Sequence, residues 1–147
     1  DYRPMPDTPE TILAFDFGAR RIGVAVGQQI TSSASPLTVI ANGAQRSVWA
    51  AIAKLIDEWR PARLIVGMPS NADGTPAAIG AAVTAFMTEL EQFSLPIDSV
   101  DERYTSIEAE GLLKAQPQSG QQRRISKEKI DAAAAVLIAE RWLKKEF

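Results

Sequence analysis

The chain has 147 residues, of which 46% are hydrophobic and 23% are charged, and its formal net charge is −2. These values are typical of one globular domain that buries its core without disulfides. Cysteine and histidine are both absent, which excludes disulfides, thiolate or imidazole catalysis, and zinc held by Cys or His. The negative charge argues mildly against nucleic acid as a partner, although a local basic patch can outweigh it. No signal peptide or membrane-length apolar run is apparent, so we expect a cytoplasmic protein.

Three strands are predicted near the N-terminus, after a flexible, proline-containing tail over residues 1–10. TILAFDFG (11–18) is a nearly continuous apolar run of strand length, and RRIGVAVGQQ (20–29) follows it after a short turn. SPLTVI (35–40) is the third predicted strand. Connections this short favour antiparallel hairpins.

A helix is predicted over residues 47–59, because apolar residues from Val48 to Trp59 recur with the helical period. Ser47 is expected to be its N-cap. The apolar run RLIVGMP (63–69) is then a fourth strand. A right-handed crossover through the helix would place this strand parallel to an earlier one.

The second half of the chain is predicted to contain more helix than strand. In order we expect a helix from Pro76 to about Phe93 with Thr75 as its N-cap, a strand over 96–102, a short helix over 106–115, and a final helix over 127–145. Trp49, Trp59 and Trp142 fall at helical core spacings and are predicted to pack in the core. The whole pattern predicts a single α/β domain over residues 11–147. Its five-stranded mixed sheet has the first three strands antiparallel and carries helices on both faces.

Asp16 is unusual because it lies inside the most apolar predicted strand, where Asp is uncommon. An ionised carboxylate without a partner in such surroundings costs roughly several kcal/mol. Asp16 must therefore reach a cation, a group of donors or the end of the sheet. A salt bridge to Arg20 or Arg21 and a functional site both satisfy this requirement.

Asp131 raises the same question on the final predicted helix. Its neighbours at i+3, i+4 and i+7 are Ala134, Ala135 and Ile138, a face of mostly small side chains that allows close approach to a sheet. Asp131 would then point toward the sheet. The alternative is a carboxylate at the edge of the buried face, paired with Lys127 at i−4.

Two further acids, Asp101 and Glu102, end the fifth predicted strand. Adjacent residues of a strand face opposite sides, so only one of these two can point toward any given site. A solvated strand end is the alternative for both.

A mixed sheet can bring its first strand, its fifth strand and a final helix together. Converging carboxylates repel one another unless a cation neutralises them, and ligand sets of oxygen atoms alone suit Mg²⁺ or Mn²⁺. Two such ions about 4 Å apart can clamp an in-line displacement at phosphorus. The cations that could contact phosphate are Arg20, Arg21, Arg103, Arg123, Arg124, Lys127 and Lys129. A solvated surface charge is the alternative for each of them.

Four segments carry a resemblance to a known family, namely LAFDFGARRIGVAVG, IVGMPSNADGTP, VDERYTSIEAE and KIDAAAAVLI. In order and spacing they resemble the YqgF/RuvX family, the Holliday-junction-resolvase-like or pre-16S rRNA nucleases of bacteria. The resemblance extends from about Ile12 to Trp142 and implies a ribonuclease-H-like fold. Ala19 stands where Thr is common in the family, and Ser70 where Leu is common. Neither departure removes an expected metal ligand.

The resemblance also implies a site and an activity. Carried over by position, Asp16, Glu102 and Asp131 are the catalytic acids and the ligands of Mg²⁺ or Mn²⁺. Asp73 is a weaker candidate for the third ligand, because a loop holds geometry less well than a strand end. The implied activity is metal-dependent processing of the 5′ end of pre-16S rRNA in ribosome biogenesis, by two-metal phosphodiester hydrolysis. The implied partners are nucleic acid and ribosomal particles, and we expect a monomer or weak dimer.

Three other functions stay open at the level of the sequence. The first is a Holliday-junction-resolvase-like endonuclease that acts on branched DNA with the same metals. The second is a non-catalytic nucleic-acid-binding factor, which the negative net charge slightly favours. The third is a fragment of the actin-like ATPase fold, which shares the Asp-x-Gly hairpin but normally uses two such domains.

Overall fold

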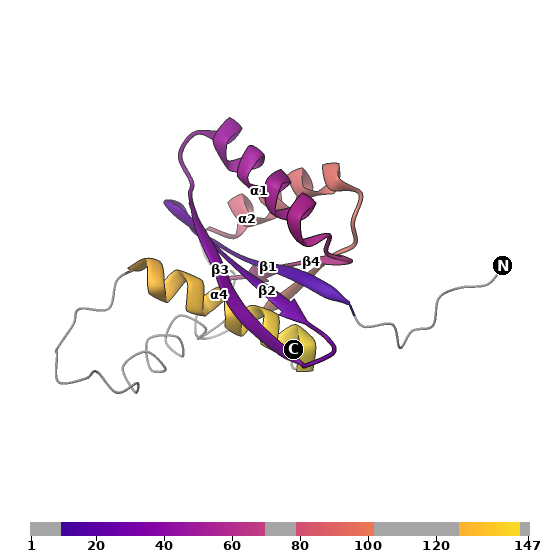
Figure 1. The fold of residues 1–147 in the computed structure, drawn as a ribbon. Coiled ribbons are helices and arrows are strands. Elements are labelled where there is room, and N and C mark those ends of the chain that lie inside the picture. Colours follow the sequence, from indigo (N-terminus) through magenta and orange to yellow (C-terminus); the bar gives the residue numbers. More distant parts are fainter. Residues whose placement is uncertain (1–9, 70–78, 102–126, 145–147) are drawn as a thin grey trace, which may run out of the picture.

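The computed structural model describes residues 10–69, 79–101 and 127–144, which form a β-sheet with helices on both of its faces (Figure 1). The elements in chain order are β1 (Thr11–Phe17), β2 (Arg21–Gln28), β3 (Ser33–Ala41), α1 (Gln45–Trp59), β4 (Arg63–Met68), α2 (Gly80–Leu90), the 3₁₀ helix η1 (Glu91–Phe93), β5 (Ile97–Asp101) and α4 (Lys127–Lys144). Within these described ranges, no helix is long and apolar enough to cross a membrane.

The five strands are arranged in the order β3-β2-β1-β4-β5, so β1 is the central strand. β1 pairs with β2 and β2 with β3 in antiparallel fashion, whereas β1 pairs with β4 and β4 with β5 in parallel. The predicted mixed sheet with three antiparallel strands is therefore confirmed. The parallel β1–β4 pair follows from the crossover through α1, as predicted.

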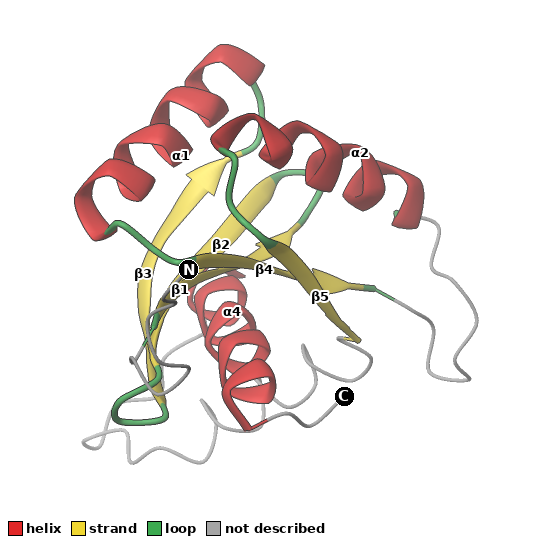
Figure 2. Ribbon diagram, turned by 90° about the vertical axis from the view of Figure 1, so that its right-hand side faces the viewer, coloured by secondary structure: helices red, strands yellow, loops and turns green. Residues whose placement is uncertain are grey.

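The two faces of the sheet have different partners. Figure 2 shows α1 and α2 above one face and α4 below the other. Leu13 and Phe15 of β1 belong to the larger core under α1 and α2, and the alternate residues Ile12 and Ala14 belong to the core under α4. On the first face, the ring of Phe86 lies with its centroid 5.7 Å from that of Phe15.

The face that α4 turns toward the sheet contains several small side chains. Ala134, Ala135 and Ala139 are buried on α4, together with Ile138. Side chains this small allow a helix to lie close to a sheet, since the distance between layers depends on the side chains between them. The predicted small-residue face of the final helix is thus confirmed, and it determines how near α4 comes to β1 and β2.

Helix α1 ends at Trp59 as predicted, but its start and the exposure of its last residue differ from the prediction. It begins at Gln45 with Ala44 as its N-cap and no side-chain cap, so the predicted cap by Ser47 is wrong. The Val48 amide already donates to the Ala44 carbonyl at 3.1 Å, which places Ser47 inside the first turn. Trp59, predicted to be buried, is 37% exposed at the last position of the helix.

The remaining described helices agree with the prediction except at the start of α2, and α4 begins at Lys127 as predicted. α2 begins at Gly80 and not at Pro76, and it continues as η1 to Phe93. Thr75 and Pro76, with the short helix predicted over 106–115, lie outside the described residues. Trp49 packs against the core under α1 and α2, and Trp142 is buried under α4, as predicted.

Candidate functional site

Asp16 lies near the carboxyl end of the central strand, on the face covered by α4. Its position alternates with those of Ile12 and Ala14, which are buried against α4, so the three side chains share one face of β1. Asp16 is itself only partly buried. Its register partner on β2 is Gly23, so the neighbouring position on that face carries no side chain.

At Gly23 the backbone of α4 comes close to the backbone of the sheet. A Cβ atom added there would overlap the carbonyl oxygen of Asp131 and would lie 2.8 Å from its carbonyl carbon. The backbone of Asp131 therefore rests directly on the strand position beside Asp16. The structure thus brings Asp16 and Asp131 to the same face and the same end of the sheet, although they are far apart in sequence.

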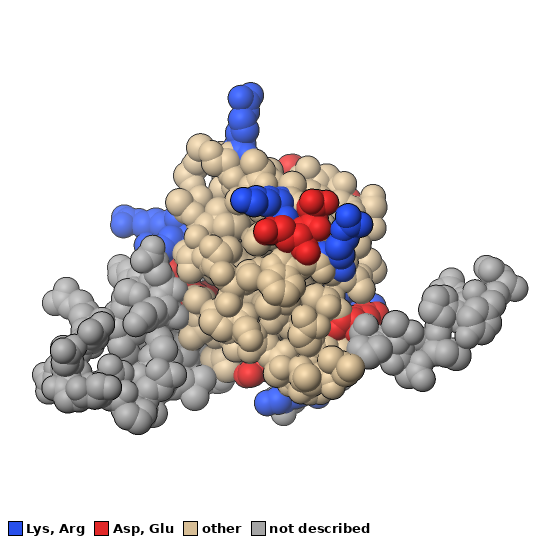
Figure 3. Space-filling view, viewed as in Figure 1, with Lys and Arg blue, Asp and Glu red and all other residues tan. Residues whose placement is uncertain are grey.

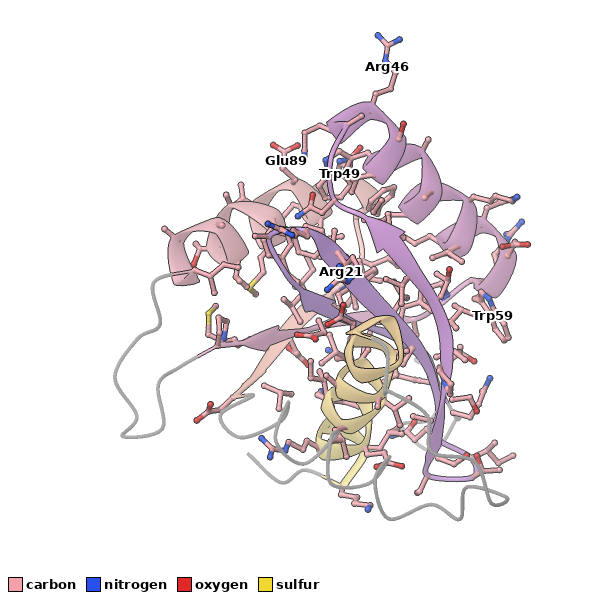
Figure 4. The ribbon with its side chains drawn as sticks, turned by 90° about the vertical axis from the view of Figure 1, so that its left-hand side faces the viewer. Arg21, Arg46, Trp49, Trp59 and Glu89 are labelled. Atoms are coloured by element: carbon pink, nitrogen blue, oxygen red, sulfur yellow. The ribbon has the colours of Figure 1, made fainter. Side chains whose placement is uncertain are left out.

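Asp131 is bound by an arginine from β2. The Nε atom of Arg21 donates to the Oδ2 atom of Asp131 at 2.7 Å, and the two side chains are 28% and 25% exposed. Figure 4 shows Arg21 on the strands next to the start of α4. The sequence suggested Lys127 as the partner of Asp131, but the observed partner lies 110 positions away. Arg21, expected at the phosphate, thus contacts an acid of the site.

The tight β1–β2 hairpin determines where Arg21 lies. The Gly18 amide donates to the Arg21 carbonyl at 2.9 Å, and a Cβ at Gly18 would come within 2.7 Å of that carbonyl oxygen. Asn42, which follows β3, binds the same turn through two hydrogen bonds. Its Nδ2 donates to the Gly18 carbonyl at 2.8 Å and its amide donates to the Arg20 carbonyl at 2.8 Å.

Asn42 is a supporting residue that the sequence analysis missed. Nothing in its local sequence distinguishes it from an ordinary loop asparagine, because its partners come from the preceding hairpin. The adjacent arginines of that hairpin also differ in exposure: Arg20 is exposed, and Arg21 is partly buried against Asp131.

Of the two acids expected at the end of the fifth strand, the structure describes Asp101 but not Glu102. Val100 of β5 is buried under α4, so Asp101, the next residue, points to the opposite face. Among the residues that the structure describes, no three acids form a group that could hold a metal ion. Several predicted site residues lie outside the described part: Glu102, Asp73, Arg103, Arg123 and Arg124, and the side chains of Lys127 and Lys129.

A second polar cluster anchors the other end of α4. The Trp142 Nε1 atom donates to Asp98 Oδ2 at 3.0 Å, and Arg63 Nη1 donates to the same oxygen at 3.2 Å. The Arg63 guanidinium also lies over the Trp142 ring, 5.4 Å from its centroid. This cluster fixes the far end of α4 on β4 and β5, and so helps to set the direction in which the Asp131 end points.

Charged side chains of both signs lie on the described part of the surface. On the face in Figure 3, the blue and red side chains are intermixed. The exposed surface of α1 shows the same mixture, with Lys54 and Arg60 near Asp57 and Glu58 in sequence.

The order of the strands and the helices on both faces of the sheet define the class of protein, the ribonuclease-H-like fold. The chain is similar to a Thermus thermophilus RuvC solved with a Holliday junction substrate. The TM-score is 0.54 at 13% identity, over 92% of this chain and 94% of that one. It is also similar to a Fowlpox virus resolvase solved with Holliday junction DNA, with a TM-score of 0.55 at 8% identity, over 92% of this chain and 97% of that one. At such low identities these likenesses establish the fold alone.

The chain belongs to the RuvX family, because a family model described as "RuvX: Holliday junction resolvase" matches residues 10–145. A relative from Dechloromonas aromatica is 44% identical over 133 residues, which are 90% of this chain and 89% of the relative. One from Legionella pneumophila (strain Lens) is 46% identical over 134 residues, 90% of this chain and 94% of the relative. Both carry the name "Putative pre-16S rRNA nuclease". The expected family is thereby confirmed, and with it the enzyme class, nuclease.

Proposed function

We propose that this chain is a metal-dependent nuclease that processes the 5′ end of pre-16S rRNA. The names of relatives that match 90% of the chain support the substrate. The observation that carries the proposal is the convergence of Asp16 and Asp131 across Gly23. Binding to ribosomal particles and a cytoplasmic location belong to the same proposal.

The two acids suit a divalent ion of the Mg²⁺ or Mn²⁺ type. Both offer carboxylate oxygens, both are partly exposed, and they come from different rigid elements, a central strand and a helix. We propose Glu102 as the third ligand. When bound, one or two such ions supply an activated water and stabilise the charge that develops at phosphorus.

The chain's own residues would then hold the RNA and keep the acids in place. Arg20, exposed on the clamped hairpin, is suited to a backbone phosphate. Gly23 keeps the Asp131 end of α4 against the sheet, and the cluster around Trp142 keeps the other end there. The proposed further phosphate contacts are Arg21, Arg103, Arg123, Arg124, Lys127 and Lys129.

The test is cleavage of a 5′-leader fragment of pre-16S rRNA by the full chain in Mn²⁺. Asp16→Asn and Asp131→Asn should each lower the cleavage rate by about a hundredfold or more, since each removes a charged ligand. Asp57→Asn is the matched control, because the Asp57 side chain is 83% exposed on α1, on the other side of the sheet. If Asp16→Asn cleaves as fast as the wild type, the assignment fails.

A second candidate is an endonuclease for branched DNA, which the description of the matching family model favours. Competition between a four-way DNA junction and the structured RNA, at equal concentration, separates the two substrates. Symmetric cutting of two strands requires two active sites, so a chain that sediments strictly as a monomer counts against this second candidate. A non-catalytic binder would bind RNA equally well in EDTA and after Asp131→Asn, with no cleavage under any condition.

A further inference from the structure

Arg21 is a basic residue that the fold places against Asp131, one of the candidate acids. Its Nε atom lies 2.7 Å from Asp131 Oδ2, and Asp131 in turn rests on Gly23, the register partner of Asp16. The guanidinium thus pairs with Asp131, which shares one end of one face of the sheet with Asp16. Carboxylates that converge in this way repel each other unless positive charge lies among them.

Hydrogen bonds of the hairpin fix the backbone of Arg21. Its carbonyl closes the hairpin with Gly18, and Asn42 holds both Gly18 and Arg20. Arg21 is the first residue of β2, so its backbone is held by the strand after it and by the hydrogen-bonded turn before it. Its side chain is 28% exposed and that of Asp131 is 25% exposed, so water and ions have access to the pair.

We infer that Arg21 is the internal counter-ion of the metal-free site and competes with a divalent ion for Asp131. This inference rests on the proposed function, because it takes Asp131 as a metal ligand. A carboxylate oxygen that accepts a charge-assisted hydrogen bond from Arg21 is a poorer ligand for a second cation. Arg21 therefore lets the site fold without metal, and it weakens the binding of metal when metal arrives.

The test measures Mn²⁺ binding directly, without substrate. The full chain is stripped with EDTA and titrated with Mn²⁺, and free Mn²⁺ is followed by its electron paramagnetic resonance signal. Arg21→Met should lower the Kd for Mn²⁺ by roughly three- to tenfold, the effect of removing one partly exposed charge-assisted hydrogen bond. Arg46→Met removes the same charge from an exposed residue that points away from the molecule in Figure 4, and it should leave the Kd unchanged.

Thermal unfolding supplies a second measurement. Without metal, Arg21→Met should melt below the wild type, and Mn²⁺ should raise its melting temperature by more than it raises that of the wild type. Arg21→Lys keeps the charge but lacks the guanidinium donor, so its Kd should lie between those of the wild type and Arg21→Met. This milder variant tests the inference even if Arg21→Met fails to fold.

The outcomes separate this inference from the proposed function. If the wild type binds Mn²⁺ but neither Arg21 variant binds it more tightly, Arg21 does not compete with the metal and the inference is overturned alone. If binding is weaker in both variants, Arg21 orients Asp131 for the metal instead. If the wild type itself binds no Mn²⁺, the metal dependence in the proposed function fails as well.

Discussion

Substituting Gly23 by Ala should weaken both the fold and the cleavage activity, because it forces α4 away from the sheet at Asp131. The added methyl group would overlap the Asp131 carbonyl oxygen and lie 2.8 Å from its carbonyl carbon, where ordinary contact begins at 3.4 Å. Both clashing atoms belong to the backbone, so no side-chain rotation relieves the overlap. The start of α4 must therefore shift by roughly half an ångström or more.

The size of the effect follows from two opposing contributions. Overpacking of this kind costs about 1–3 kcal/mol, and a clash with backbone belongs at the upper end of that range. Replacing Gly by Ala also lowers the conformational entropy of the unfolded chain, which raises the free energy of unfolding by about 0.4–1 kcal/mol. We expect a net loss of about 2 kcal/mol, or a fall in melting temperature of about 4–8 °C for a domain of this size.

Gly27→Ala is the matched control, because Gly27 lies on the same face of the same strand. Its added methyl group would meet Ile12 Cγ1 at 2.8 Å and Leu143 Cδ1 at 3.3 Å, which are side-chain atoms that can move. We expect a loss below about 1.5 kcal/mol and nearly normal cleavage. Thermal unfolding and leader-RNA cleavage should be measured on both variants. If Gly23→Ala is as stable and as active as Gly27→Ala, the close contact between Gly23 and Asp131 does not organise the site.

Three further perturbations test other contacts. Asn42→Ala should lower the free energy of unfolding by about 1 kcal/mol, through loss of the 2.8 Å bond to the Gly18 carbonyl, and an unchanged urea midpoint would contradict this. Trp142→Phe keeps a ring under Arg63 but loses the donor to Asp98, so we expect a loss of about 1–2 kcal/mol in thermal unfolding. Removal of divalent ions with EDTA should abolish cleavage while leaving the circular dichroism spectrum unchanged, since Arg21 already neutralises Asp131. A chain that unfolds in EDTA would refute that account.

The strands could be predicted because strands that are buried on both faces consist of uninterrupted apolar residues. Ile12 to Phe15, Ile22 to Val26 and Leu64 to Val66 are buried on both faces, and such runs are apolar without interruption. The approach of α4 was predictable for the same reason, since Ala134 and Ala135 leave a surface that only a close neighbour can bury. The helix starts were less predictable: α1 begins at Gln45 without a side-chain cap, so the favourable residue Ser47 carried no information about the boundary.

Two of the candidate acids could be picked out from the sequence, but their partners in the fold could not. Asp16 and Asp131 stand out because each interrupts an apolar pattern, and such an interruption is visible in the sequence alone. Arg21, Asn42 and Asp98 act through partners that the chain brings near only after folding, and their own surroundings in sequence show no such break. The prediction for Trp59 was wrong for a different reason: helical spacing alone does not show that this last residue of α1 is 37% exposed.

The Arg21–Asp131 contact joins positions 110 residues apart, and α4 follows all five strands in the chain. During synthesis from the N-terminus, the strands therefore emerge before the helix that covers one of their faces. Until α4 docks, Ile12, Ala14 and Ile65 cannot form their cluster with Ile138 and Ala139, and Asp16 has no Asp131 beside it. A nascent chain that stops short of α4 thus holds only half of the acidic pair, so the pair can form only after translation has passed this helix.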